Sequence, residues 1–122
     1  MKIRIKGDSV RLRLTQTDVR NLGRVGYVQE QTHFGKTVFG YRLQRSDAAN
    51  EMSADFTDGN MTVFIPNDFV NILVKTDRIG YDTNQPIGEN KTLFILVEKD
   101  FQCLDHTLED QSDMYLNPNK TC

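Results

Sequence analysis

The sequence lacks tryptophan, has only two cysteines and three prolines, and contains no long apolar run. A membrane-spanning helix needs about 18 or more consecutive apolar residues, so we expect no membrane partner. Two cysteines cannot form a disulfide framework, and residues 1–10 alternate charge with apolar side chains where a signal peptide would carry an apolar block. We therefore expect a cytoplasmic protein with a single domain over residues 1–122.

Signatures of catalysis are also missing. The sequence has no glycine-rich phosphate loop, no Ser-His-Asp set and no dinucleotide-binding fingerprint. A nucleophilic Cys103 would have only His33 and His106 as candidate bases. Zinc binding by Cys103, His106 and Cys122 is an alternative, but one short Cys-x-x-His pair is a weaker signal than the paired spacings of zinc sites. We predict no catalytic residue, no metal site and no cofactor, and favour a protein that is not an enzyme.

Charge is distributed unevenly along the chain. Residues 1–49 contain ten Lys and Arg against four Asp and Glu, a net charge of +6, whereas residues 50–122 contain five against thirteen, a net charge of −8. This asymmetry indicates either a surface that meets an anion or two halves that attract each other within the fold.

Apolar residues alternate with polar ones in a way that predicts hairpins and short helices. The first hairpin alternates Ile3 and Ile5 with cations, turns at residues 7–9 and continues to Leu14. Thr15 or Thr17 caps a first helix, and Pro66 opens a second. The other predicted strands are Tyr27–Thr32, Lys36–Gln44, Met52–Thr57, Met61–Ile65, Ile79–Asp82 and Thr92–Glu98. We expect residues 83–90 to form a polar loop.

The two halves of the chain align with each other. At an offset of 51, Val10–Leu14 matches Met61–Ile65, and offsets of 54 and 55 then bring the total to seven identities. We therefore predict two repeated ββαββ units over residues 1–49 and 50–100, with residues 101–122 as an irregular C-terminal tail packed on them. The predicted fold is α+β, a small and mostly antiparallel β-barrel of about eight strands with two short helices.

Two resemblances follow from these residues. The segments Met1–Thr15 (MKIRIKG-x-S-x-R-x-RLT) and Leu96–Leu104 (LVEKDF-x-CL) resemble those of a family of small, uncharacterised bacterial proteins, which implies a fold but no activity. Each half also resembles the swapped-hairpin module of transition-state regulators and addiction antitoxins, through Lys6–Thr15 and Asp58–Pro66. That resemblance implies nucleic-acid contacts by Lys6 and Arg13 alone. The first copy departs from the motif at Thr15, which replaces the proline, and the second at Phe64, which replaces the arginine.

The predicted contact surface is a ladder of cations on the first hairpin, which suits an anionic ligand or nucleic acid. Its members are Lys2, Arg4, Lys6, Arg11 and Arg13. Like charges on neighbouring strands destabilise a hairpin, so the alternative is that acids of the chain itself compensate them. The candidates for this compensation are Asp55, Glu98, Asp100, Glu109, Asp110 and Asp113. Tyr27, Tyr41 and Tyr81 are candidates to stack on bases or to pack in the fold, and the repeat pairs Tyr27 with Tyr81.

The function that we predict is that of a non-enzymatic binding or interaction module whose basic N-terminal hairpin meets an anionic ligand or nucleic acid. One alternative is a small phosphate-handling hydrolase, which requires a basic pocket inside the barrel with carboxylates for a metal ion. Another is a structural subunit of a larger assembly, which requires an exposed apolar patch and a stable oligomer.

Overall fold

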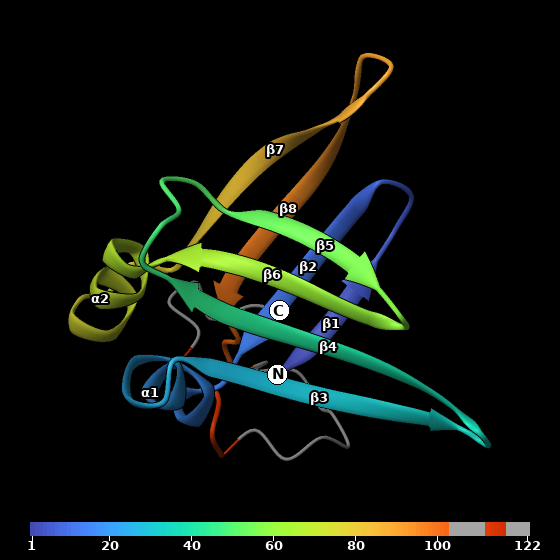
Figure 1. Cartoon of the computed structure of the whole chain (residues 1–122). Helices are drawn as coiled ribbons and strands as arrows, with labels where there is room; N and C mark the ends of the chain where they lie inside the picture. The colour runs from blue at the N-terminus through green and yellow to red at the C-terminus, as the bar shows by residue number, and fades with distance from the viewer. Residues whose placement is uncertain (103–111, 117–122) are drawn as a thin grey trace.

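The computed structural model of the chain describes residues 1–102 and 112–116. Its elements follow the order strand, strand, helix, strand, strand, and then the same order again (Figure 1). This arrangement confirms the predicted α+β class with eight strands and two helices. The elements are β1 (Lys2–Ile5), β2 (Ser9–Leu14), α1 (Gln16–Arg24), β3 (Tyr27–Phe34), β4 (Thr37–Ser46), β5 (Ser53–Thr57), β6 (Asn60–Pro66), α2 (Asn67–Lys75), β7 (Gly80–Gly88) and β8 (Lys91–Lys99).

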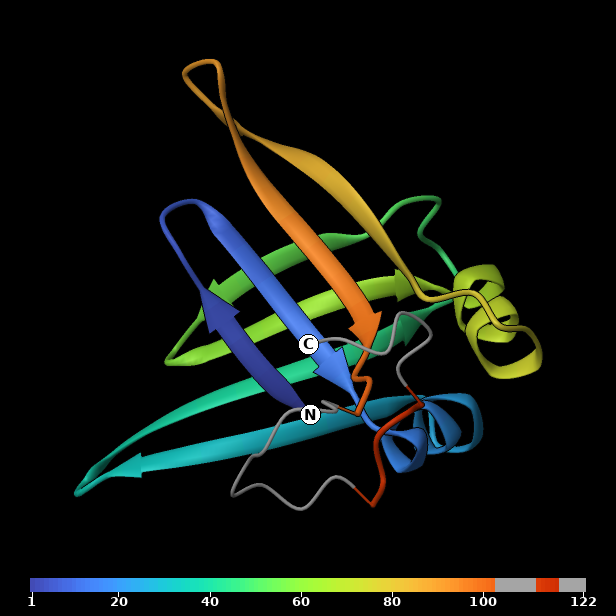
Figure 2. The same ribbon diagram turned by 180° about the vertical axis from the view of Figure 1, so that it is seen from behind.

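The strands form two four-stranded sheets, in the orders β1-β2-β8-β7 and β3-β4-β6-β5. Each sheet joins one hairpin from the first half of the chain to one from the second half (Figure 2). The joins are the parallel pairs β2–β8 and β4–β6, whereas the pairs within each hairpin are antiparallel. The first and second halves of the chain therefore interleave in both sheets.

The core lies between the inner faces of the two sheets. Leu12 pairs in register with Val97 in one sheet and Leu43 pairs with Val63 in the other, and all four are fully buried. Along β2, β4, β6 and β8 these buried positions alternate with more exposed ones, which is the pattern of a sheet with one buried face. Burial of the alternating apolar set fixes the register, because a slip of one residue would turn that set toward water.

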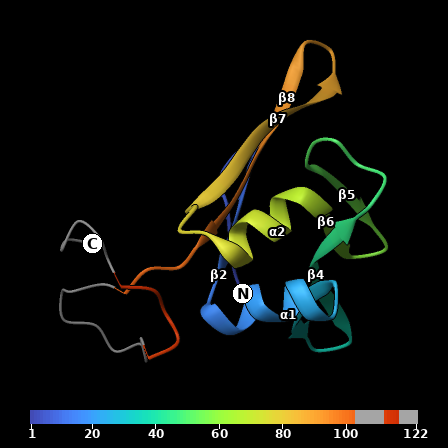
Figure 3. The same cartoon turned by 90° about the vertical axis from the view of Figure 1, so that its left-hand side faces the viewer.

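Both helices lie at one end of the sheets, and the four hairpin turns lie at the side away from them (Figures 1 and 3). Of the two predicted caps of α1, Thr15 and Thr17, Thr15 is the observed one, in a capping box with Asp18: the Thr15 hydroxyl accepts from the Asp18 amide, and the Asp18 carboxylate accepts from the Thr15 amide. Pro66 precedes α2, where its missing N–H leaves no helical hydrogen bond unmade. The helices approach closely at Gly23, where an added Cβ would lie 3.0 Å from a Val74 methyl group.

Side chains join the edges of the two sheets. The carboxamide of Gln85 on β7 accepts from the Ala54 amide of β5 at 2.6 Å and donates to the Ala54 carbonyl at 3.2 Å. On the side of β1, the other edge strand of the first sheet, the hydroxyl of Tyr41 on the inner strand β4 donates to the Met1 carbonyl at 3.1 Å. Among the described residues no strand pairing closes the sheets into one barrel, so these contacts connect two packed sheets.

The predicted polar loop over residues 83–90 is wrong, because these residues continue strand β7 as far as Gly88. They pair with β8 up to a bulge between Pro86 and Gly88. The strand lies at the edge of its sheet, where polar side chains are solvated and a proline withdraws no required donor. The other predicted strands lie close to the observed bounds.

Candidate anion-binding site

The antiparallel register of β1 and β2 places four of the predicted cations on one outward face. Lys2 lies opposite Arg13, and Arg4 lies opposite Arg11, while Ile3, Val10 and Leu12 between them belong to the core or pack against it. Lys6 follows β1 in the turn, and its amide donates to the Ser9 carbonyl. Like charges opposite each other on a hairpin are destabilising, so the acidic residues beside this face determine how far its positive charge is compensated.

Strand β8 supplies the first compensating acid. Its parallel pairing with β2 places Glu98 beside Arg13, and Oε1 of Glu98 lies 3.1 Å from Nε of Arg13 and 3.3 Å from Nε of Arg11. Both guanidinium groups are partly solvated, so each ion pair contributes about 0–1 kcal/mol. One carboxylate thus shares its charge between the two arginines.

Asp100, just beyond β8, compensates Lys2. Its side chain is only 5% exposed, and Oδ2 lies 3.3 Å from the Lys2 ammonium nitrogen. The Asp100 amide donates to the Leu14 carbonyl at the end of β2, which holds the residue beside the hairpin. A buried carboxylate needs such a cation nearby, because desolvation of an unpaired charge is costly.

Compensation within the chain is thus confirmed for Glu98 and Asp100. Asp55 lies on β5 in the other sheet, where its carboxylate accepts from the Thr57 hydroxyl. Asp113 accepts from the Thr17 amide at 3.3 Å and so caps α1. Glu109 and Asp110 lie outside the described residues. The structure therefore assigns two of the six candidate acids to the cations.

Arg4 and Lys6 differ from the other members of the ladder. Both are exposed, and in the described part of the chain no carboxylate lies within ion-pair distance of either. Together with Arg11, Ser9 and Phe94 they line a shallow recess of about 210 Å³ on the outer face. The recess carries three cationic side chains and a hydroxyl group, and no carboxylate lines it among the described residues.

Phe94 was not identified from the sequence as part of the site. Strand β8 pairs in parallel with β2, so Phe94 lies beside Ser9, and its amide donates to the Asp8 carbonyl at 2.9 Å. The hydrophobic run of residues 93–97 predicts a central strand, but nothing in it shows which strand lies alongside. The Phe94 ring lies at this recess only because β8 pairs with β2 in the folded chain.

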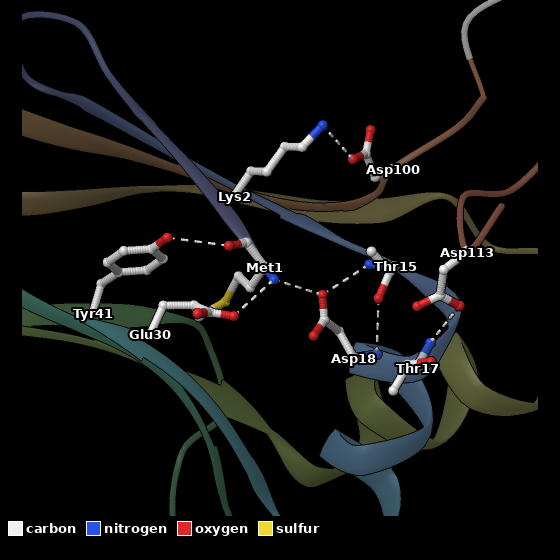
Figure 4. A network of polar contacts seen from close by, with 9 residues as sticks. All are labelled: Met1, Lys2, Thr15, Thr17, Asp18, Glu30, Tyr41, Asp100 and Asp113. Atoms are coloured by element: carbon white, nitrogen blue, oxygen red, sulfur yellow. Dashed lines mark hydrogen bonds and ion pairs between the residues drawn. The ribbon is translucent and has the colours of Figure 1, made fainter. Parts of the chain in front are cut away.

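A second polar cluster surrounds the N-terminus (Figure 4). The Met1 ammonium lies 2.9 Å from Oδ2 of Asp18 and 3.4 Å from Oε1 of Glu30. Burial raises the pKa of Tyr41, and the charges of Glu30 and Asp18 raise it further. The phenol therefore stays protonated at neutral pH and donates to the Met1 carbonyl. This cluster links the start of β1 to α1, β3 and β4, and its charged and polar groups contact one another.

The three tyrosines have different surroundings. The Arg42 guanidinium lies 3.9 Å from the centre of the Tyr27 ring, and Phe69 of α2 stacks on Tyr81 at 4.1 Å. Tyr27 pairs with Gln44 on the outer face, whereas Tyr81 pairs with the buried Val97. The predicted equivalence of Tyr27 and Tyr81 is therefore wrong in space, because the two strand pairings differ by one residue and turn the rings to opposite faces.

Within residues 1–102 and 112–116 no group of three or more His, Cys, Asp or Glu is placed to hold a metal ion. Cys103, His106 and Cys122 lie outside the described residues. Neither helix of the described part has the length and apolar composition that a membrane crossing needs.

Two packed sheets, two helices at one end and an outward basic face define a small α+β protein with a candidate anion-binding site. The chain belongs to the family of unknown function DUF7009, whose model matches residues 1–119. This membership agrees with the resemblance to an uncharacterised family. No curated protein and no solved structure matches the chain.

Proposed function

We propose that this protein is a non-enzymatic binding module that binds nucleic acid through the outer face of the β1–β2 hairpin. The observation that carries the proposal is the difference between the cations of the ladder. Lys2, Arg11 and Arg13 have carboxylates within 3.3 Å, whereas Arg4 and Lys6 are exposed without one in the described chain. Cations that no acid compensates attract the phosphates of a nucleic acid and release its counterions.

The recess supports a ligand that carries both a phosphate and a ring. Arg4, Lys6 and Arg11 supply charge, and the Ser9 hydroxyl can donate to a phosphate oxygen. Phe94 presents an aromatic surface at the same place, and base stacking on aromatic side chains contributes about 1–3 kcal/mol in proteins that bind single strands. We therefore expect single-stranded DNA or RNA to bind more tightly than duplex DNA.

The interleaved sheets support the finer assignments within this proposal. Each hairpin of residues 1–49 pairs with a hairpin of residues 50–100, as the resemblance to swapped-hairpin modules implies. We infer a duplicated ββαββ unit that forms one domain, and a module of the bacterial cytoplasm. A phosphate-handling hydrolase would need carboxylates beside the cations for a metal ion, and in the described chain none lines the recess.

The proposal is tested by fluorescence-anisotropy titration with labelled single-stranded DNA, RNA and duplex DNA at several salt concentrations. For the wild type we expect affinity for single strands that falls linearly with the logarithm of salt concentration. The variant Arg4→Gln/Lys6→Gln removes the uncompensated charges, and we expect affinity to fall about tenfold or more and the salt slope to decrease by about 1–2.

Arg24→Gln/Lys36→Gln is the matched control, since it removes the same two residue types from exposed positions at the end of α1 and in the β3–β4 turn. It should leave the affinity within about twofold of the wild type. Phe94→Leu should weaken the binding of single-stranded DNA and RNA more than the binding of duplex DNA. Equal losses in the double variant and its control, or no binding at low salt, would overturn the proposal.

Exposed apolar residues at the hairpin turns favour a second candidate, a structural subunit of a larger assembly. Phe34 at the end of β3 is 67% exposed, and Phe56 near the end of β5 is 63% exposed. Phe56 stacks on Phe39 with ring centres 6.2 Å apart, and contiguous exposed apolar patches are typical of interaction surfaces. Sedimentation equilibrium tests this candidate: an oligomer that dissociates in Phe34→Ser/Phe56→Ser supports it, and a monomeric wild type contradicts it.

A further inference from the structure

A second cavity shares no lining residue with the basic recess and is lined by residues at the end of α2, just before β7 and at the end of β8. Its volume of about 700 Å³ falls within the range of roughly 300–1,000 Å³ that is typical of small-molecule sites. Its walls are mostly apolar, and the side chains that supply them are Leu73, Val74, Ile79, Phe101 and Leu116.

Lys99 is the buried cation of this cavity. The residue is only 6% exposed, and its ammonium group donates to the Thr76 carbonyl at 3.0 Å. The same nitrogen lies 5.1 Å from the centre of the Tyr115 ring, and both Thr76 and Tyr115 line the cavity. The ammonium group therefore sits between two lining residues, with one hydrogen bond to a neutral carbonyl and further donors to offer.

No carboxylate of the described chain lies within ion-pair distance of Lys99. Burial accordingly lowers the pKa of its amine, and the more distant charge of Asp77 opposes that effect. A buried charge is normally paired, because desolvation disfavours the charged form. Lys99 thus differs from Asp100, the next residue along the chain, which has Lys2 as its partner.

The charges around the cavity define the ligand that it suits. Besides Lys99, the charged lining residues are Lys75 and Asp77, so the lining carries a net charge of +1. A doubly charged phosphate monoester would exceed this charge, whereas a carboxylate matches it. We propose that this cavity binds a small monocarboxylate with an apolar body, whose carboxylate pairs with the Lys99 ammonium while its body lies against the apolar walls.

Isothermal titration calorimetry with octanoate tests the proposal on the full chain, with octanol as the uncharged probe of the same length. We expect octanoate to bind at least about tenfold more tightly than octanol, because only the acid can pair with the buried ammonium. In Lys99→Met, which keeps the length of the side chain and removes the charge, octanoate should lose about tenfold or more in affinity.

Lys91→Met is the matched control, since Lys91 is an exposed lysine at the other end of β8 and does not line the cavity, and it should change affinity by less than about threefold. Ile79→Glu leaves Lys99 in place and adds a carboxylate to the cavity wall, which repels the octanoate carboxylate. It should therefore also weaken octanoate binding, and it tests the proposed site even if Lys99→Met fails to fold. No heat with octanoate, equal affinity for octanol, or unchanged affinity in both Lys99→Met and Ile79→Glu would overturn the proposal. The nucleic-acid titration of Lys99→Met should match the wild type, so each proposed site can fail independently.

Discussion

The α-ammonium group of Met1 lies 2.9 Å from Oδ2 of Asp18, and the same oxygen accepts a hydrogen bond from the Thr15 amide. The Asp18 side chain is 11% exposed, so the ion pair is largely shielded from water. One carboxylate thus attaches the start of β1 to the first turn of α1. These two elements are separated by β2 in the chain, and their relative position depends on this contact.

We expect Asp18→Asn to lower the free energy of unfolding by about 2 kcal/mol, because the amide can still accept from Thr15 but leaves the Met1 ammonium without its nearest partner. Urea denaturation followed by circular dichroism measures the loss. Asp68→Asn is the control, since Asp68 is an exposed acid in the first turn of α2, and it should cost less than about 0.5 kcal/mol. Equal losses in the two variants would show that Asp18 acts only as a helix-terminus charge.

The carboxamide of Gln85 mimics a peptide group at the free edge of β5. Gln85→Ala should lower the free energy of unfolding by about 1–3 kcal/mol, because the Ala54 amide and carbonyl lose their partners. Gln31→Ala, on the exposed part of β3, should change it by less than about 0.5 kcal/mol. Amide hydrogen exchange at Ala54 should also accelerate in Gln85→Ala, and unchanged protection would contradict this role.

Docking of residues 112–116 should depend on pH through Asp113. A hydrogen bond from the Thr17 side chain is the largest of the effects that hold the pKa of Asp113 below its ordinary value of 3.8. A lowered folded-state pKa means that the stabilisation is complete above that ordinary value and is lost as pH falls through the folded-state pKa. The methyl resonance of the buried Met114 should therefore move toward its random-coil position only in this acidic range.

Asp113→Asn provides the comparison for that titration. Asparagine can accept the hydrogen bond from the Thr17 amide, but it does not titrate, so the Met114 resonance should no longer follow this acidic transition. A transition of the same midpoint and size in the variant would assign the pH dependence to another group.

Lys99 should titrate below 10.5, its ordinary value, because burial lowers the pKa of its amine. The Cε chemical shift, followed by NMR in selectively labelled protein, reports the midpoint. Asp77 raises the pKa, so Asp77→Asn should move the midpoint lower still. Binding of octanoate should move it in the opposite direction, since a bound carboxylate favours the ammonium form. A midpoint that does not respond to Asp77→Asn would contradict the assignment of this charge.

Short sequence patterns correctly predicted the features that depend on neighbouring residues, such as helix caps and the buried faces of strands. Thr15 precedes a helical run and caps it, and the alternation around Leu12 identified the buried face of β2. Residues 83–90 were misassigned because an edge strand needs only one paired side and tolerates polar residues and a proline. Tyr27 and Tyr81 match in the alignment but differ in space, because the β7–β8 pairing contains a bulge.

The sequence predicted the cations of the candidate site, but it did not show which of them have a carboxylate beside them. The alternation places Arg4 and Arg11 on one face, but only the pairing of β2 with β8 shows that Glu98 compensates Arg11 while Arg4 has no carboxylate beside it in the described chain. Residues 85 positions apart, such as Arg13 and Glu98, meet through tertiary structure alone. The Lys99 cavity likewise combines residues from α2, β8 and residues 112–116, which no sequence window contains.

The parallel pairing of β2 with β8 also has a consequence for synthesis of the chain on the ribosome. The sheet that contains β1 and β2 is complete only after residues 91–99 have emerged, although its first strand begins at Lys2. A nascent chain that ends before β7 therefore leaves the backbone edge of β2 without its partner strand. Contacts of this sequence separation slow folding, because the intervening chain must be ordered before they form. The N-terminal hairpin should thus be a binding site for chaperones during translation and become inaccessible to them when β8 docks.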